Sequence, residues 1–88
     1  MEQQFQIRPN ITCRPTNLNL IMLFDREKGV MYELNETASS LIAILRDKPS
    51  SAREISAVLA ADYDEDPSVI EAQVVEFLDD FAKSGLIE

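Results

Sequence analysis

The stretch Leu18–Leu45, LNLIMLFDREKGVMYELNETASSLIAIL, decides the fold of this chain. It starts with a nearly continuous apolar run, Leu18–Phe24, which is typical of a central strand that is buried on more than one side. The polar residues Asp25–Gly29 follow and predict a turn, because the glycine adopts a positive φ angle without strain. A second strand is predicted at Val30–Leu34. The two apolar segments therefore form an antiparallel hairpin.

The second strand of this hairpin presents two different faces. Alternate residues of a strand point to opposite sides of a sheet. Leu34 is expected to anchor the core beneath the helices, and only one of the two faces is able to line a groove. One face carries Val30, Tyr32 and Leu34, and the other carries Met31 and Glu33.

Three helices are predicted after the hairpin. Asn35 is a favourable N-cap for the first helix, which ends before Pro49. The pattern Ser51–Glu54 is a capping box that begins the second helix. The third is expected over residues 67–84, since proline is tolerated at the first helical position and Gly85 ends the helix.

A weaker extended segment, Phe5–Cys13, precedes the hairpin, and Pro9 and Pro15 favour an edge or irregular position for it. Strands first and helices after them predict an α+β fold. It has an N-terminal three-stranded antiparallel sheet followed by three helices and is similar to a winged helix-turn-helix. The length of 88 residues predicts a single domain over residues 1–88.

The third helix carries a wide apolar stripe. On a helical wheel the stripe spans roughly 160°, against about 100° for an ordinary core-facing stripe. Either the helix lies across both the sheet and the first two helices, or one margin of the stripe lines a groove for a partner. The two interpretations are compatible, and the sequence leaves open which margin would face the strand. The stripe consists of Val69, Ile70, Val74, Val75, Phe77, Leu78, Phe81 and Ala82.

The composition favours a binding module over a standalone enzyme. A chain of this size buries only about 60% of its unfolded surface, which leaves room for one core and for no deep catalytic cavity. The formal charge of −8 disfavours nucleic acid and anionic membranes, because both attract Lys and Arg. An acidic surface suits a partner with basic residues, although it also serves solubility alone.

The residues that most catalysis requires are missing. The chain has no histidine, and Cys13, its single cysteine, has no candidate base. The acidic run Asp62–Asp66 is only faintly similar to a calcium loop, because Pro67 and Gln73 stand where that loop needs glycine and a bidentate glutamate. We therefore expect no enzymatic activity, no metal site and no cofactor.

The sequence shows no pattern of a secretion signal or of a membrane-spanning segment. The polar start Met1–Gln4 is unlike a signal peptide. No apolar run approaches the roughly 20 residues of a membrane span. The expected location is the cytoplasm, and a single cysteine fits a reducing compartment.

The strand Val30–Leu34 ends the predicted sheet, so its outer edge is expected to stay unpaired. An unpaired edge beside a helix is a place where an extended peptide docks. Further features lie in a fixed order along the chain: Phe24–Ala38 (FDREKGVMYELNETA), Tyr63–Pro67 (YDEDP), and Val74–Leu78 (VVEFL) with Gly85–Ile87 (GLI). In these stretches the chain resembles the PqqD family, small peptide-recognition proteins of pyrroloquinoline quinone biosynthesis and other modified-peptide pathways.

The resemblance implies binding of the leader segment of a ribosomally made precursor peptide, without catalysis. In this family the leader adds as a strand to the third strand of the sheet and lies against the third helix. The precursor is then presented to a separate maturation enzyme. For this chain the resemblance favours a lasso-peptide pathway with a cysteine-protease-like leader peptidase. The nearest alternative is a chaperone for a radical SAM enzyme, and a less favoured one is an acidic winged-helix regulator.

Carried onto this sequence, the resemblance implies a site shared by the edge strand and the third helix. The strand would supply main-chain hydrogen bonds, and the helix would supply apolar pockets. Asp79, at the margin of the stripe, would pair with a basic leader residue. The expected leader-binding residues are Val30, Met31, Tyr32, Glu33, Leu34, Val74, Val75, Phe77, Leu78, Asp79 and Phe81.

Overall fold

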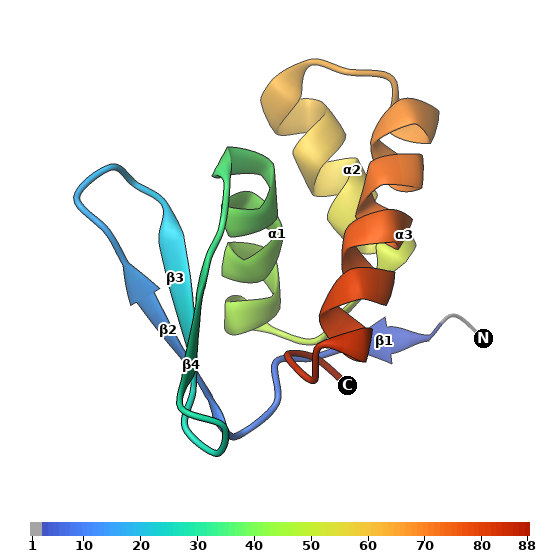
Figure 1. Cartoon of the computed structure of the whole chain (residues 1–88). Coiled ribbons are helices and arrows are strands. Elements are labelled where there is room, and N and C mark those ends of the chain that lie inside the picture. The colour runs from blue at the N-terminus through green and yellow to red at the C-terminus, as the bar shows by residue number, and fades with distance from the viewer. Residues whose placement is uncertain (1–2) are drawn as a thin grey trace.

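Three antiparallel strands form the main sheet, in the order β2 (Ile11–Pro15), β3 (Ile21–Asp25) and β4 (Val30–Glu33). Figure 1 shows the computed structural model, which describes residues 3–88. The first two residues, which belong to the polar start of the sequence and to the predicted domain, lie outside the described residues. The position of β3 between β2 and β4 confirms the central strand that its apolar sequence predicts.

Three helices follow the sheet: α1 (Glu36–Asp47), α2 (Ala52–Tyr63) and α3 (Pro67–Lys83). Helix α1 lies between the sheet and the other two helices, and α2 and α3 pack side by side (Figure 1). This arrangement confirms the predicted α+β fold of a small antiparallel sheet followed by three helices.

Capping side chains explain where the helices begin. The Asn35 side chain accepts a hydrogen bond from the backbone N–H of Ala38 at 2.9 Å. Ser51 Oγ accepts from the Glu54 N–H at 3.1 Å, and the Glu54 carboxylate accepts from the Ser51 N–H at 3.0 Å. Asp66 caps α3 in the same way. These bonds satisfy N–H groups that have no partner inside a helix. The caps predicted at Asn35 and at Ser51–Glu54 are thus present at the starts of α1 and α2.

The N-terminal segment pairs with two distant parts of the chain. Strand β1 (Gln4–Phe5) pairs with β5 (Ser50–Ser51), and the residues that follow β1 run beside the C-terminal Leu86–Glu88. A turn at Pro9 then leads into β2. The predicted segment Phe5–Cys13 is thus divided between two sheets, at a proline that the sequence marks as an interruption.

Strand β3 begins at Ile21 and not at Leu18, whose side chain is 78% exposed. The Thr16 N–H donates to the Leu20 carbonyl at 2.8 Å, and Thr16 Oγ1 accepts from the Leu18 N–H at 3.3 Å. Asn19 has a φ of 61°, which asparagine tolerates better than most residues. A tight turn therefore removes the first residues of the apolar run from the strand.

The core lies on one side of the sheet only. Leu23 of β3 is fully buried on the face that α1 covers, and Leu34 is buried beneath the helices as expected. On the opposite face Met22 and Phe24 are half-buried and Met31 is 57% exposed. The prediction that β3 is buried on both sides is therefore wrong, because no described element covers this second face.

Asp25 is a buried part of β3 and does not belong to the solvent-exposed turn that the sequence predicts. Its side chain is 1% exposed, and Oδ1 accepts hydrogen bonds from the N–H groups of Glu27 (2.9 Å) and Lys28 (3.1 Å). The Asn10 side-chain amide donates to the same oxygen at 3.1 Å. These bonds hold the pKa of Asp25 below its usual value, and the bond from Lys28 has the largest effect. Asp25 therefore ties the β3–β4 turn to the turn before β2.

Asp25→Asn is expected to destabilise the protein at pH 7 and to have a smaller effect at pH 3. A carboxyl pKa that is lowered in the folded state adds stability above the unfolded value of about 3.9, and this contribution is lost as the pH falls. Thermal unfolding followed by circular dichroism at both pH values measures the change. Asp62→Asn, at an exposed position, is the matched control. An equal loss of stability at pH 7 and pH 3 would contradict the role given to the Asp25 charge.

Candidate functional site

The free side of β4 is an open sheet edge. Strand β4 pairs with β3 on one side, and no strand among residues 3–88 pairs with its other side. Figure 1 shows β4 at the front of the sheet, with α1 behind it and α3 beyond. The unpaired edge predicted from the sequence is thus present in the described structure, beside a helix.

The register of the sheet shows which backbone groups point outward. The Leu34 N–H donates to the Ile21 carbonyl at 3.3 Å, and the register pairs Leu23 with Tyr32. In an antiparallel ladder, alternate residues of an edge strand direct both N–H and C=O to the neighbouring strand. The N–H and C=O groups of Val30, Tyr32 and Leu34 therefore point toward β3. The N–H and C=O groups of Met31 and Glu33 face the open side, where they are available to an added strand.

The side chains of β4 divide in the way that the sequence predicts. Tyr32 packs against the core, and Leu34, which directly follows the strand, is buried within it. Val30 is exposed at the start of the strand. Met31 and Glu33 are exposed and point to the face of the sheet that the helices do not cover. A peptide beside β4 would therefore contact the backbone of these last two residues more than their side chains.

Helix α3 directs the middle of its apolar stripe into the core. Val74, Leu78 and Phe81 are buried there, whereas Val69 and Val75 are exposed. The buried stripe is therefore narrower than the sequence suggests. Residues on its two margins remain as the part of α3 that is available to a partner.

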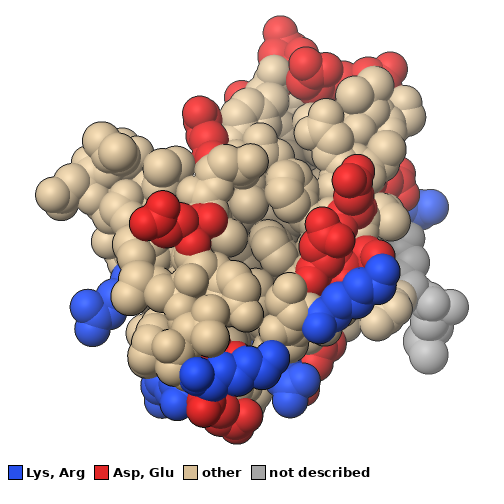
Figure 2. All heavy atoms as spheres, viewed as in Figure 1, with Lys and Arg blue, Asp and Glu red and all other residues tan. Residues whose placement is uncertain are grey.

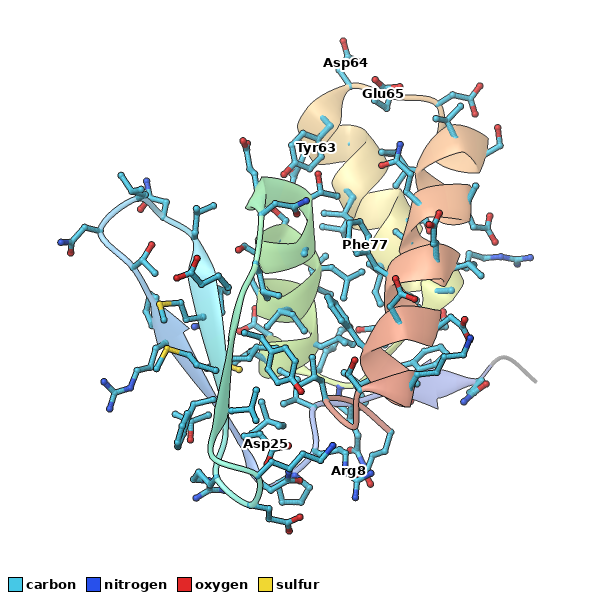
Figure 3. The ribbon with its side chains drawn as sticks, in the orientation of Figure 1. Arg8, Asp25, Tyr63, Asp64, Glu65 and Phe77 are labelled. Carbon is cyan, nitrogen blue, oxygen red and sulfur yellow. The ribbon has the colours of Figure 1, made fainter. Side chains whose placement is uncertain are left out.

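One margin of α3 contains Phe77 and faces the sheet side of the molecule. Phe77 is half-buried, its ring centroid lies 5.9 Å from that of Phe81, and it lies between α1 and α3 (Figure 3). Gln73, Glu76 and Asp80 line a small recess of about 180 Å³ together with it. These three polar residues are not among those predicted from the sequence, although positions 73, 76, 77 and 80 share a face by helical periodicity.

The other margin of α3 contains Val75 and Asp79 and turns away from β4. Glu71, on the same side, lines hollows with residues of α2 and of the short β1–β5 sheet. Asp79 forms an ion pair with Lys83 at 2.9 Å, and this interaction raises the pKa of Lys83. Asp79 therefore already has a cationic partner on its own helix.

A contact between the β3–β4 turn and the end of α3 fixes the spacing of strand and helix. Lys28 Nζ donates to the Ser84 carbonyl at 3.4 Å, and the same ammonium lies against Gly85, which has a φ of 77°. This contact joins the β3–β4 turn to the C-terminal end of α3. We use the name edge site for the open side of Met31 and Glu33 together with the Phe77 margin of α3.

The charge around the edge site is mainly negative. Figure 2 shows Asp and Glu side chains over α3 and at the loop between α2 and α3, whereas the surface between β4 and α3 is mostly uncharged. Glu76 and Asp80 contribute two carboxylates on the α3 side. This pattern favours an apolar, extended segment that carries basic residues near α3.

Metal-ligating and nucleophilic side chains are few among the described residues. No cluster of three or more His, Cys, Asp or Glu suited to a metal ion occurs among residues 3–88. Burial raises the pKa of the half-buried Cys13 thiol, and the charge of Arg46 lowers it to a smaller extent. A thiol with a raised pKa is a poor nucleophile at neutral pH. No helix in the described part of the chain has the length and apolar character that crossing a membrane requires.

Fold and edge together define a small α+β protein whose three-stranded sheet has an open edge at β4. The sequence matches the family described as Coenzyme PQQ synthesis protein D (PqqD) over residues 21–87. This match spans most of the sequence, and the chain belongs to the PqqD family. A search of curated proteins gave no significant match.

Solved structures share the fold over nearly the whole chain. A lasso peptide synthetase B1 complexed with the leader peptide superposes with a TM-score of 0.83 at 22% identity, covering 98% of this chain and 99% of that one. TbiB1 in complex with the TbiA(beta) leader peptide gives 0.86 at 20% identity and covers 94% of each chain. The PqqD truncation of Methylobacterium extorquens PqqCD, a RiPP recognition element, gives 0.80 at 22% identity, covering 97% of this chain and 88% of that one.

Proposed function

We propose that this protein binds the leader segment of a ribosomally made precursor peptide by adding it as a strand to β4, against α3. The observation that carries the proposal is the open edge of β4, where Met31 and Glu33 direct N–H and C=O groups to a side that no strand of the described residues pairs with. Family membership supports the proposal, as do the leader peptides bound to the two B1 proteins of the same fold.

Backbone pairing alone would give too little affinity. Met31 and Glu33 offer two donors and two acceptors, and about 1 kcal/mol net per hydrogen bond gives about 4 kcal/mol. A Kd of about 1 μM corresponds to about 8 kcal/mol. The difference must come from side chains of the peptide that bury apolar surface against Phe77 and its neighbours. Strand addition would therefore fix the register, and the helix would select the sequence.

The proposed role is recognition without catalysis, with delivery of the precursor to a separate maturation enzyme in the cytoplasm. We favour a lasso-peptide pathway with a cysteine-protease-like leader peptidase, because the sequence resembles free-standing leader-binding subunits and a lasso peptide synthetase B1 shares the fold. The PqqD structure matches a smaller share of its own chain, and service to a radical SAM enzyme is the alternative.

A titration with a labelled peptide that spans the leader of the pathway's precursor tests the proposed function. Fluorescence anisotropy is expected to give saturable binding with a Kd in the micromolar range or below, as about 8 kcal/mol of binding free energy requires. A peptide with the same composition in scrambled order is the control. Absence of saturation at concentrations well above the micromolar range would overturn the proposal.

Phe77→Ala is expected to weaken leader binding about tenfold, because truncating a buried aromatic anchor costs about 1–2 kcal/mol or more. Val75→Ala, on the opposite margin and 51% exposed, is expected to leave the Kd unchanged within about twofold. The same anisotropy titration measures both. The reverse result would place the peptide on the Val75 and Asp79 side of α3.

A further inference from the structure

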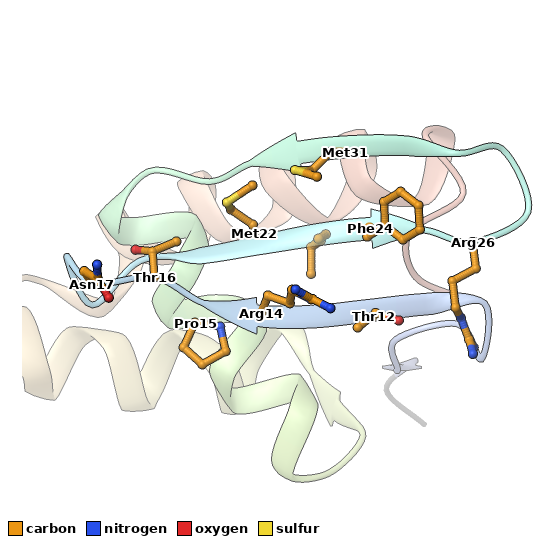
Figure 4. A pocket seen from close by; sticks show the side chains of 10 residues that line it. Thr12, Arg14, Pro15, Thr16, Asn17, Met22, Phe24, Arg26 and Met31 are labelled. Carbon is orange, nitrogen blue, oxygen red and sulfur yellow. The ribbon is translucent and has the colours of Figure 1, made fainter.

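The uncovered face of the main sheet carries a broad hollow of about 750 Å³. Figure 4 shows that all three strands and the turn after β3 contribute side chains to it. We call it the outer hollow. Its principal residues are Thr12, Arg14, Met22, Phe24, Arg26 and Met31.

The apolar side chains of the outer hollow do not serve the core. An antiparallel sheet with one face in water usually alternates apolar residues inside with polar residues outside. Here β3 is apolar on both faces, but only the Ile21 and Leu23 face is covered by helices. Met22, Phe24 and Met31 remain partly or largely exposed on the other face. Large apolar side chains grouped on an exposed surface are typical of an interaction site.

The charge of the outer hollow is opposite to that of the whole chain. Two arginines and no carboxylate line it, although the chain carries a net charge of −8. No Asp or Glu among residues 3–88 forms an ion pair with Arg14 or Arg26. The Arg26 guanidinium donates to the carbonyls of Pro9 and Asn10, which holds the group in place and leaves its charge without a counterion.

We propose that the outer hollow docks the maturation enzyme, through a segment of that enzyme that presents a carboxylate beside apolar side chains. This inference rests on the proposed function, because the maturation enzyme is the partner that the proposed function names. Arg14 and Arg26 would pair with the carboxylate, and Met22 and Phe24 would pack against the apolar part. A symmetric dimer through this face would bring like charges together, which opposes self-association.

The geometry allows the enzyme and the leader to bind at the same time. Met31 takes part in both surfaces: its N–H and C=O face the open edge of β4, and its side chain lines the outer hollow. A strand added to β4 would widen the same face of the sheet. An enzyme seated in the outer hollow would therefore lie directly beside the bound leader.

Charge reversal at Arg14 tests the docking surface. Arg14→Glu and, separately, Phe24→Ser are compared with wild type for binding to the purified leader peptidase of the same pathway by biolayer interferometry. Each is expected to weaken this association about tenfold or more and to leave the leader Kd unchanged within about twofold. Lys48→Glu, which makes the same charge change at an exposed position outside the outer hollow, is expected to have no effect.

Each possible result of this comparison either supports or overturns the proposed docking surface. Unchanged association in both variants, or no association of the wild type with the peptidase, would overturn it. Equal loss of leader and enzyme binding with unchanged thermal stability would place the leader itself in the outer hollow and would also overturn it. A dimer that sedimentation detects in the wild type and that Arg14→Glu dissociates would assign the surface to a second copy. Enzyme binding that depends on Arg14, in a protein that binds no leader, would support docking and reject the proposed function.

Discussion

Proline at Met31 or Glu33 is expected to weaken leader binding about tenfold or more, with little loss of stability. The N–H groups of these residues face the open side of β4, so each proline removes a donor from the added strand and none from the β3–β4 ladder. The proline ring also occupies space that the incoming backbone needs. Proline is tolerated on an edge strand when its nitrogen faces away from the neighbouring strand, because no hydrogen bond of the sheet is then lost. Anisotropy gives the Kd, and thermal unfolding shows whether the fold persists.

Two controls separate the backbone from the side chain and from the sheet as a whole. Met31→Ala and Glu33→Ala keep the N–H and are expected to change the Kd less than the matching prolines. Cys13→Pro places the ring on the free side of β2, at the opposite edge of the same sheet, and is expected to leave leader binding unchanged. If Cys13→Pro weakens binding as much as the β4 prolines do, or if neither β4 proline matters, pairing at β4 is rejected.

The parts of the fold that the sequence predicts are those set by local chemistry. Alternation in β4 identifies Tyr32 and Leu34 as inward residues, and the structure packs both against or within the core. Asn35 and the Ser51–Glu54 box start helices because their side chains satisfy nearby N–H groups within a few residues. Such signals need no knowledge of distant contacts.

The parts that the sequence does not predict depend on distant contacts. Leu18 belongs to an apolar run, but Thr16 closes a turn around it, and hydropathy carries no signal for that turn. Asp25 looks like a turn residue, yet the Asn10 side chain and the turn backbone donate hydrogen bonds to its Oδ1 inside the protein. In both cases hydrogen bonds of polar side chains set a boundary of β3: its start after the Thr16 turn and its end at the buried Asp25.

The candidate site shows the same division. An open edge at Val30–Glu33 follows from strand order, which the sequence indicates. The margin of α3 beside that edge does not follow, because helical periodicity is symmetric about the buried stripe. Packing of α2 against one side of α3 breaks this symmetry and leaves the Phe77 margin toward the sheet. The outer hollow was missed because an apolar strand was expected to be covered on both faces.

Leu23→Ala is expected to destabilise the protein by about 3 kcal/mol, since large-to-small changes at fully buried sites cost about 2–5 kcal/mol. Leu23 is 0% exposed on the central strand. A domain of this size has a total stability of about 4–13 kcal/mol at 0.05–0.15 kcal/mol per residue. The loss is therefore a large share of the total, and Tm should fall by about 12–24 °C at 4–8 °C per kcal/mol. Urea and thermal unfolding measure both quantities.

Leu18→Ala is the matched control, because it makes the same substitution in the same apolar run at a side chain that is 78% exposed. Its expected effect is within about 0.5 kcal/mol, as for most surface changes. The run would then contain two leucines of equal hydropathy whose removal differs about sixfold in free energy. A similar cost at both positions would mean that Leu18 is buried in solution and that β3 begins where the apolar pattern alone places it. A negligible cost at Leu23 would instead contradict the packing of α1 on the inner face of the sheet.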